Sequence, residues 1–116
     1  MYNQGDIIAV YYPLTDKPVK TKLRPAIVVS NATSNQLDND ILVCPITSKI
    51  RGDQFSYLLI NNNHLSSSLP SESEVRCNKI MTIRVWEKQI VGKISRVNEP
   101  FLSDILQLVQ KVFSND

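Results

Sequence analysis

The sequence predicts a mainly β fold of the α+β class, an antiparallel sheet or small barrel that ends in one helix. Short runs rich in β-branched and aromatic residues recur up to residue 94, and segments rich in Pro, Asn, Ser and Gly separate them. The apolar residues take up a helical spacing only near the C-terminus. Several strands followed by a single helix, without alternation of the two, favour antiparallel over parallel pairing.

The strand-like runs come first along the chain. We expect strands at residues 6–12, 26–30, 41–46, 55–60, 74–83 and 90–94. Residues 13–23 are polar and basic and are expected to form a long loop or the extension of a hairpin. Residues 31–40 and 61–73 have the composition of turn-rich connections.

The sequence makes a more specific prediction for two of these strands. Pro45 predicts that its strand lies at an edge or contains a bulge, because proline cannot donate to a strand ladder. In residues 74–83 the alternation places Val75 and Cys77 on one face. Glu74, Arg76 and Asn78 are then expected on the other face.

The final segment has helical periodicity over about residues 99–113, with Asn98 as the expected N-cap and Pro100 in the first turn. Its apolar stripe is wide enough to pack on the sheet and partly on a second subunit, and packing on the sheet alone explains it equally well. The stripe consists of Phe101, Leu102, Ile105, Leu106, Leu108, Val109, Val112 and Phe113.

Length and composition predict one soluble domain over residues 1–116. The chain has 116 residues, of which 42% are hydrophobic and 21% charged, so neither disorder nor a disulfide scaffold is expected. No apolar run approaches the ~20 residues of a membrane span, and the N-terminus has no signal-peptide pattern. We therefore expect a cytoplasmic protein with Cys44 and Cys77 as reduced core thiols. The net charge of +2 is too small to indicate nucleic-acid binding by itself.

The familiar cofactor and metal motifs are missing from the sequence. It has no Gly-rich phosphate loop, no CxxC and no HExxH, and one histidine with two distant cysteines does not make a usual zinc site. No cofactor and no metal are therefore expected. His64 lies in an Asn- and Ser-rich segment, where a surface histidine without a catalytic role is expected rather than a member of a triad.

The most informative stretch surrounds Arg24. Arg24 ends a basic segment that contains four cationic residues and one acidic residue, so the local charge is +3. The cationic residues are Lys17, Lys20, Lys22 and Arg24. Proline and an apolar strand follow directly, so the guanidinium is expected at a rigid rim, where its planar fork suits phosphate. A plain surface arginine at the start of a strand is the alternative.

Two later stretches offer polar groups at strand ends. Thr47, Ser48 and Lys49 follow an apolar strand and could bind phosphate oxygens or form an ordinary hydroxyl-capped turn. Glu74 and Arg76 share a face and could form a salt bridge or line a cleft.

Taken together and in order, these stretches resemble the MazF/PemK family of toxins from toxin–antitoxin pairs. The first motif is GDIIAV with the PLTD and KLRPAIVVS segments that follow it; the second is ITSKI at residues 46–50; the third runs from LPS and SEVR to KIMTI at residues 69–83. The resemblance covers roughly residues 5–113.

The resemblance implies a small SH3-like curved barrel with a C-terminal helix, assembled as a homodimer. It implies metal-independent endoribonuclease cleavage of single-stranded RNA, such as mRNA at short sequences. The 2′-hydroxyl would attack the adjacent phosphate and leave 2′,3′-cyclic phosphate and 5′-hydroxyl ends. It also implies a DNA-binding antitoxin whose acidic tail lies over the basic groove, for which the +3 segment is suited.

The resemblance also assigns roles to residues. Arg24 and Thr47 correspond to the family's central catalytic pair, with Ser48, Ser73 and Arg76 in support. Lys17, Lys20, Lys22 and Lys49 are expected to hold the RNA backbone. The chain departs from the family at Met81, where many members have arginine. The acidic residues nearest this part of the third motif are Glu72 and Glu74. A non-catalytic RNA-binding module, or a toxin of this fold that acts on DNA gyrase like the CcdB relatives, are the alternatives.

Overall fold

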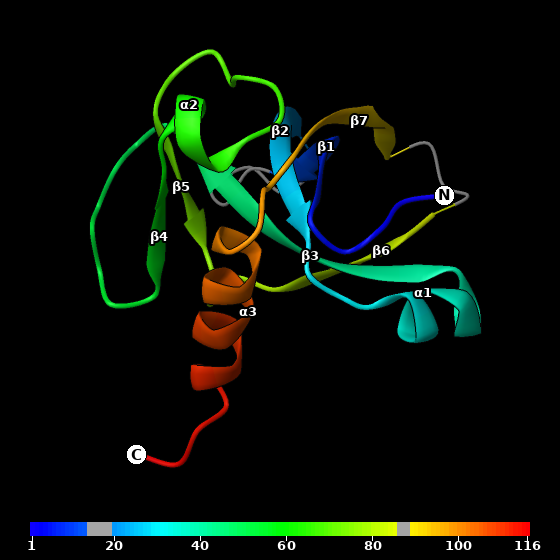
Figure 1. Ribbon diagram of the computed structural model, residues 1–116. Helices are drawn as coiled ribbons and strands as arrows, with labels where there is room; N and C mark the ends of the chain where they lie inside the picture. The colour runs from blue at the N-terminus through cyan, green and yellow to red at the C-terminus, as the bar shows by residue number, and fades with distance from the viewer. Residues whose placement is uncertain (14–19, 86–88) are drawn as a thin grey trace.

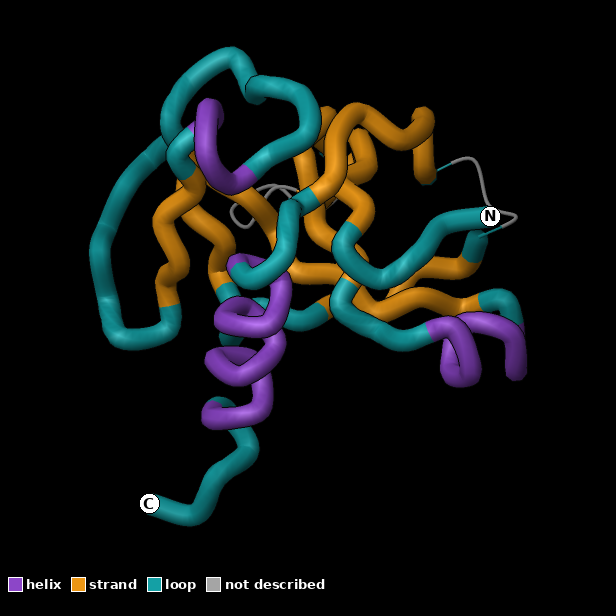
Figure 2. Tube along the Cα trace, viewed as in Figure 1, coloured by secondary structure: helices purple, strands orange, loops and turns teal. Residues whose placement is uncertain are grey.

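The computed structural model describes residues 1–13, 20–85 and 89–116. It contains one curved antiparallel sheet of seven strands, in the order β4-β5-β3-β2-β1-β7, with β6 also paired to β3. Figure 1 shows this sheet with α3 descending from it, and Figure 2 shows the strands at the centre and the helices at the periphery.

The strands are β1 (Asp6–Pro13), β2 (Thr21–Val28), β3 (Asp40–Thr47), β4 (Ser56–Leu59), β5 (Ser73–Arg76), β6 (Met81–Arg84) and β7 (Ile90–Arg96); the helices are α1 (Ala32–Asp38), α2 (Asn61–His64) and α3 (Phe101–Lys111). The predicted fold class is confirmed.

The sheet buries apolar side chains on both faces. Because side chains alternate along β2, Ile27 belongs to the apolar cluster on one face, and Ala26 and Val28 belong to the cluster on the other face. The side chains of β1 and β3 alternate between the two clusters in the same way. On the first face α3 covers the sheet with Leu102 and Ile105, which are buried. The strands are therefore fixed from both sides, and polar residues at their ends are held rigidly.

β3 is the strand on which the sheet bends, and it is not an edge strand. It pairs with β2 on one side, and on the other with β6 at Asp40–Val43 and with β5 at Ile46 and Thr47. Pro45 lies between these two partners, where the ladder on that side is interrupted. The predicted edge position is therefore wrong, because a change of partner tolerates proline as well as an edge does.

The structure corrects several other expectations. The hairpin alternative holds for the described ends of residues 13–23, since β1 and β2 stay paired as far as Pro13 and Thr21, while residues 14–19 lie outside the described residues. The predicted strand 74–83 is two strands, β5 and β6, separated by a turn that lets them pair with different parts of β3. Helices α1 and α2 lie in segments expected to be turns.

The helix ends also differ from expectation in detail. Asn31 caps α1, because its side chain accepts a hydrogen bond from the Ser34 backbone amide at 2.9 Å. Asn39 ends that helix in the left-handed conformation. Asn98 is not the N-cap of α3, because Pro100 occupies that position and no side chain caps the helix. None of the helices in the described part of the chain has the length and apolar character needed to span a membrane.

Candidate functional site

The register of β2 and β3 brings Arg24 and Thr47 together. The two strands pair through Ala26–Pro45, and continuing this register by two residues along each strand places Arg24 opposite Thr47. Both side chains are half-buried. Since side chains alternate along a strand, Arg24 lies on the same face as Ala26, at the rim of the core.

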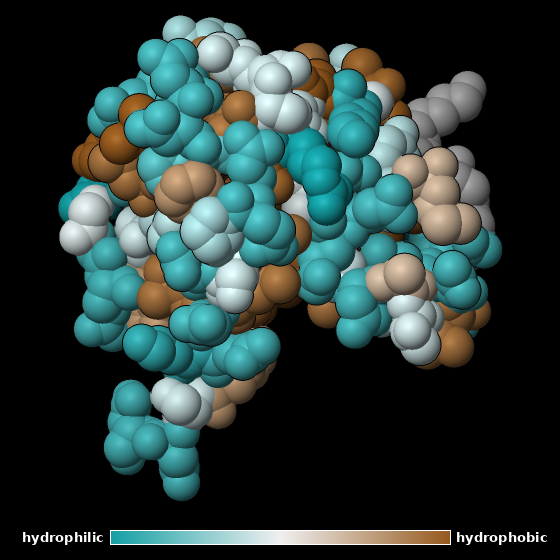
Figure 3. All heavy atoms as spheres, viewed as in Figure 1, coloured by the Kyte–Doolittle hydropathy of each residue, from teal (hydrophilic) through white to brown (hydrophobic). Residues whose placement is uncertain are grey.

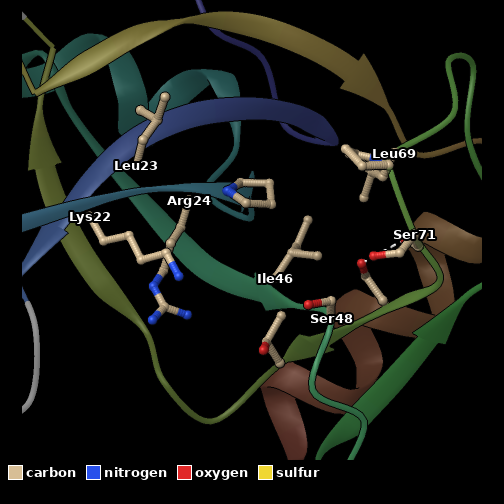
Figure 4. A pocket seen from close by; sticks show the side chains of 11 residues that line it. Lys22, Leu23, Arg24, Ile46, Ser48, Leu69 and Ser71 are labelled. Atoms are coloured by element: carbon tan, nitrogen blue, oxygen red, sulfur yellow. Dashed lines mark hydrogen bonds between the residues drawn. The ribbon is translucent and has the colours of Figure 1, made fainter.

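Arg24 and Thr47 stand between two adjoining pockets. The first, which we call the hydroxyl pocket, has a volume of ≈ 240 Å³ and is lined by Arg24, Thr47 and Ile46 together with Lys22, Leu23, Pro25, Ser48, Leu69, Pro70, Ser71 and Ser73. Figure 4 shows Lys22 and Arg24 on one side of it, Leu69 and Ser71 on the other, and Ile46 and Ser48 between them. The pocket walls thus come from β2, from the end of β3 and from the segment before β5.

The second pocket, which we call the basic pocket, has a volume of ≈ 250 Å³. It shares Arg24, Ile46 and Thr47 with the hydroxyl pocket and adds Tyr12, Pro13, Pro45, Arg51, Arg76 and Lys79. The described residues contribute four cationic side chains and no carboxylate to its lining. The shared residues place the two pockets side by side with Arg24 and Thr47 between them, and we call the two pockets together the groove.

The chemistry at the middle of the groove suits an anion. Thr47 Oγ1 accepts a hydrogen bond from the Lys49 backbone amide at 3.1 Å, which leaves the hydroxyl hydrogen of Thr47 available to donate. Within the described part of the chain, Arg24 has no carboxylate at ion-pair distance. A permanently charged fork and a hydroxyl donor therefore face the groove together.

A buried carboxylate anchors the wall of the basic pocket. Glu74 is 1% exposed; its Oε1 accepts from the backbone amides of Arg51 (2.9 Å) and Gly52 (3.1 Å), and its Oε2 accepts from Ser56 Oγ (2.8 Å). Burial alone would raise the pKa of Glu74, but these hydrogen bonds and the charge of Arg76 together lower it below its usual value. Glu74 is therefore ionised and holds the loop that carries Arg51.

Arg76 is fixed by two carboxylates. Its Nε lies 3.7 Å from Glu74 Oε2, and its Nη2 donates to Asp53 Oδ2 at 3.3 Å. The two alternatives for this stretch, a salt bridge or a cleft lining, are both realised, because Arg76 is only 9% exposed and still lines the basic pocket.

The groove brings together some of the predicted site residues and not others. Arg24, Thr47, Ser48, Ser73, Arg76 and Lys22 line it. Lys49 contributes its backbone to Thr47 but lines neither pocket, and Lys20 is exposed and lines neither pocket. Lys17 lies outside the described residues. These placements concern geometry, and the roles of the residues in binding or catalysis stay predictions.

His64 lies away from the groove, on α2. Its ring is 4.0 Å from that of Phe101 and 6.0 Å from that of Tyr57, measured between centroids. It helps to join α2 and β4 to the start of α3, and lines neither pocket.

Three residues of the groove do not emerge from the sequence alone. They are Tyr12, Arg51 and Lys79. The available signal was position: Arg51 follows the ITSKI motif directly, and Lys79 is the first residue of the KIMTI segment in the third motif.

The fold and the groove define a class, namely small curved β domains with a basic groove at one end of the sheet. The chain belongs to the family of PemK-like, MazF-like toxins of type II toxin–antitoxin systems, whose sequence model matches residues 3–113. No curated protein sequence is similar enough to the chain to count as a match.

Several solved structures share the fold of this chain. The chain is similar to a MazE–MazF structure from Deinococcus radiodurans, with a TM-score of 0.72 at 16% identity, covering 99% of this chain and 97% of that one. The Mycobacterium tuberculosis toxin MazF-mt6 gives 0.67 at 19% identity, covering 94% and 98%. An endoribonuclease in complex with its cognate antitoxin from a mycobacterial species gives 0.73 at 14% identity, covering 97% and 94%.

Proposed function

We propose that this toxin is a metal-independent endoribonuclease that cleaves single-stranded RNA, such as mRNA at short sequences, in the cytoplasm. The observation that carries the proposal is the position of Arg24 and Thr47 between the two adjoining pockets of the groove. A strand that crosses the groove presents a phosphate to this pair and places its neighbouring nucleotides in the two pockets.

The proposed reaction takes its nucleophile from the substrate. The 2′-hydroxyl attacks the adjacent phosphorus and loses its proton, the bond from phosphorus to the 5′-oxygen breaks, and that oxygen takes up a proton. The products carry a 2′,3′-cyclic phosphate and a 5′-hydroxyl. The protein must stabilise the charge that develops on the phosphate, and the guanidinium of Arg24 and the hydroxyl of Thr47 supply donors for it.

Ser48, Ser73 and Arg76 are proposed to support this site, and Lys17, Lys20, Lys22 and Lys49 to bind the RNA backbone. Ser73 is already engaged, because its hydroxyl donates to the Ser71 carbonyl at 2.9 Å, which shapes the wall of the hydroxyl pocket.

The proposed partners are a second copy of the chain and an antitoxin with an acidic tail. The apolar stripe of α3 is only partly covered: Leu102 and Ile105 are buried, whereas Phe113 is 74% exposed. Figure 3 shows the residues after α3 standing away from the body of the molecule. An exposed apolar helix end favours contact with a second subunit, and the cationic groove fits carboxylates of an antitoxin tail.

The test is cleavage of a long single-stranded RNA in EDTA by the wild type, Arg24→Ala and Thr47→Ala, with Thr33→Ala on α1 as the matched control. We expect cleavage by the wild type and the control, and a loss of about 10²–10³ in rate for each site variant. RNA binding without cleavage would instead support the non-catalytic module. Inhibition of gyrase without RNA cleavage would support the gyrase toxin.

A further inference from the structure

The basic pocket has features that the proposed chemistry at Arg24 and Thr47 does not need. Besides Arg24 it presents Arg51, Arg76 and Lys79, and no carboxylate of the described residues lines it. The hydroxyl pocket, on the other side of the pair, is lined largely by hydroxyl and apolar side chains. The two sides of the groove therefore differ in charge.

The buried part of this wall is short of hydrogen-bond acceptors. Tyr12 Oη is buried and has no hydrogen-bond partner within the described residues, whereas the buried Arg76 Nε makes no hydrogen bond but lies 3.7 Å from Glu74 Oε2. Buried polar groups are nearly always paired. The Tyr12 hydroxyl belongs to a residue that lines the basic pocket, and an anion in that pocket would bring an acceptor for it.

The wall is also built to stay in place. Glu74 fixes the backbone of Arg51 and Gly52, and Gly52 has φ +64°, a conformation that other residues adopt only with strain. Glu74 and Asp53 hold Arg76 from behind. Within the described residues Lys79 has no ion pair, and its backbone amide donates to the Arg76 carbonyl at 3.1 Å.

We propose that the basic pocket is a second phosphate subsite, in which Arg51, Arg76 and Lys79 bind a phosphate of the RNA strand next to the one held by Arg24 and Thr47. The proposal rests on the proposed function, because it places the same strand along the same groove. The two pockets then have different roles. The basic pocket, on the side of Arg76, makes an ionic contact with a phosphate, and the hydroxyl pocket, on the side of Ser48 and Ser71, contacts a nucleoside. Since phosphate contacts carry no sequence information, this subsite adds affinity and register rather than base choice.

The test measures binding of 2′-O-methyl oligoribonucleotides, which lack the attacking hydroxyl, as a function of salt. Oligo-U, oligo-A and oligo-C probes are compared for the wild type, Lys79→Gln and Arg51→Gln. Lys111→Gln on α3 is the matched control, because it too is exposed but lines neither pocket. All three substituted side chains are exposed, so thermal melting should confirm that each variant is folded.

The expected result is roughly tenfold weaker binding for Lys79→Gln and for Arg51→Gln. The slope of log affinity against log salt should become shallower by about 0.7 for each phosphate charge that the variant no longer neutralises. Both effects should be the same for the three probes, and the control should match the wild type.

Several results would overturn the subsite. Unchanged affinity and slope in both variants would do so, and so would a loss confined to one probe, which indicates a base-reading pocket. Variants that lose binding to a polyglutamate peptide but keep binding to RNA would assign the pocket to an acidic polypeptide instead.

Cleavage of ordinary RNA, measured in parallel, separates this inference from the proposed function. If the wild type cleaves RNA and the variants bind like the wild type, only the subsite is wrong. If the variants weaken binding but the wild type cleaves nothing, the subsite stands and the ribonuclease does not. A wild type that neither binds nor cleaves RNA contradicts both.

Discussion

Replacing Glu74 by glutamine should destabilise the protein, although the side chain keeps its size. Glutamine can keep one oxygen toward the amides of Arg51 and Gly52, but an NH₂ group then replaces the oxygen that faces Ser56 and Arg76. Losing charge-assisted hydrogen bonds and one partner of a buried ion pair costs about 3 kcal/mol. Asp53 still pairs with Arg76 and limits the loss.

Urea unfolding at neutral pH measures this directly, with Glu72→Gln as the control because Glu72 is exposed and two residues away. A loss of about 3 kcal/mol corresponds to a fall in Tm of roughly 10 °C for a domain of this size. The control should stay within about 0.5 kcal/mol of the wild type.

The same carboxylate sets an acid limit on stability. The pKa of Glu74 is lower in the folded state than its ordinary value of about 4.3, so its contribution is complete above that pH. The contribution is lost as the pH falls through the folded pKa. The difference in stability between wild type and Glu74→Gln should therefore shrink on acidification below about pH 4. A Glu74→Gln variant as stable as the control at pH 7, or a difference that does not depend on pH, would refute the reasoning.

Three further results are expected. Thr47→Ser should retain most RNA cleavage and Thr47→Val should lose it with little change in stability, because the proposed reaction uses the hydroxyl and not the methyl group; kcat at saturating RNA checks this. Cys44 and Cys77 should resist a thiol reagent at pH 8 until the protein is unfolded in urea, because burial raises the pKa of each thiol to about 12; rapid labelling of the native protein would contradict their burial. Asn31→Ala should lower the free energy of unfolding by about 1 kcal/mol, measured in urea, through loss of the α1 cap, and Asn31→Asp should largely retain it.

The sequence is sufficient to predict those strands and helices whose local residue pattern agrees with their packing in the folded protein. The strand from Asp6 is a run of β-branched and aromatic residues, the helix that begins near Phe101 has a helical apolar spacing, and both are found. The prediction for residues 31–40 was wrong because asparagine favours turns and helix caps alike, and only the backbone shows that Asn31 begins a helix. The edge position predicted from Pro45 was wrong because pairing with β5 and β6 depends on the tertiary fold.

The candidate site could be anticipated only in part. Arg24 and Thr47 follow from the resemblance, but their position opposite one another depends on the register of β2 and β3, which no local pattern specifies. The basic pocket could not be foreseen, because Arg51 and Lys79 stand at the ends of separate segments. Arg51 reaches the pocket because Glu74 fixes the loop that carries it, and Lys79 reaches it because the turn after Arg76 carries it there.

The central claim is that the groove holds RNA so that the substrate's own 2′-hydroxyl attacks the phosphate at Arg24 and Thr47. The most direct measurement compares an RNA that the toxin cuts with the same strand carrying one 2′-deoxynucleotide on the 5′ side of the cut, in EDTA. We expect the single change to abolish cleavage at that bond while binding persists, and the products of the unmodified strand to end in 2′,3′-cyclic phosphate. Continued cleavage of the deoxy-substituted bond would contradict the account.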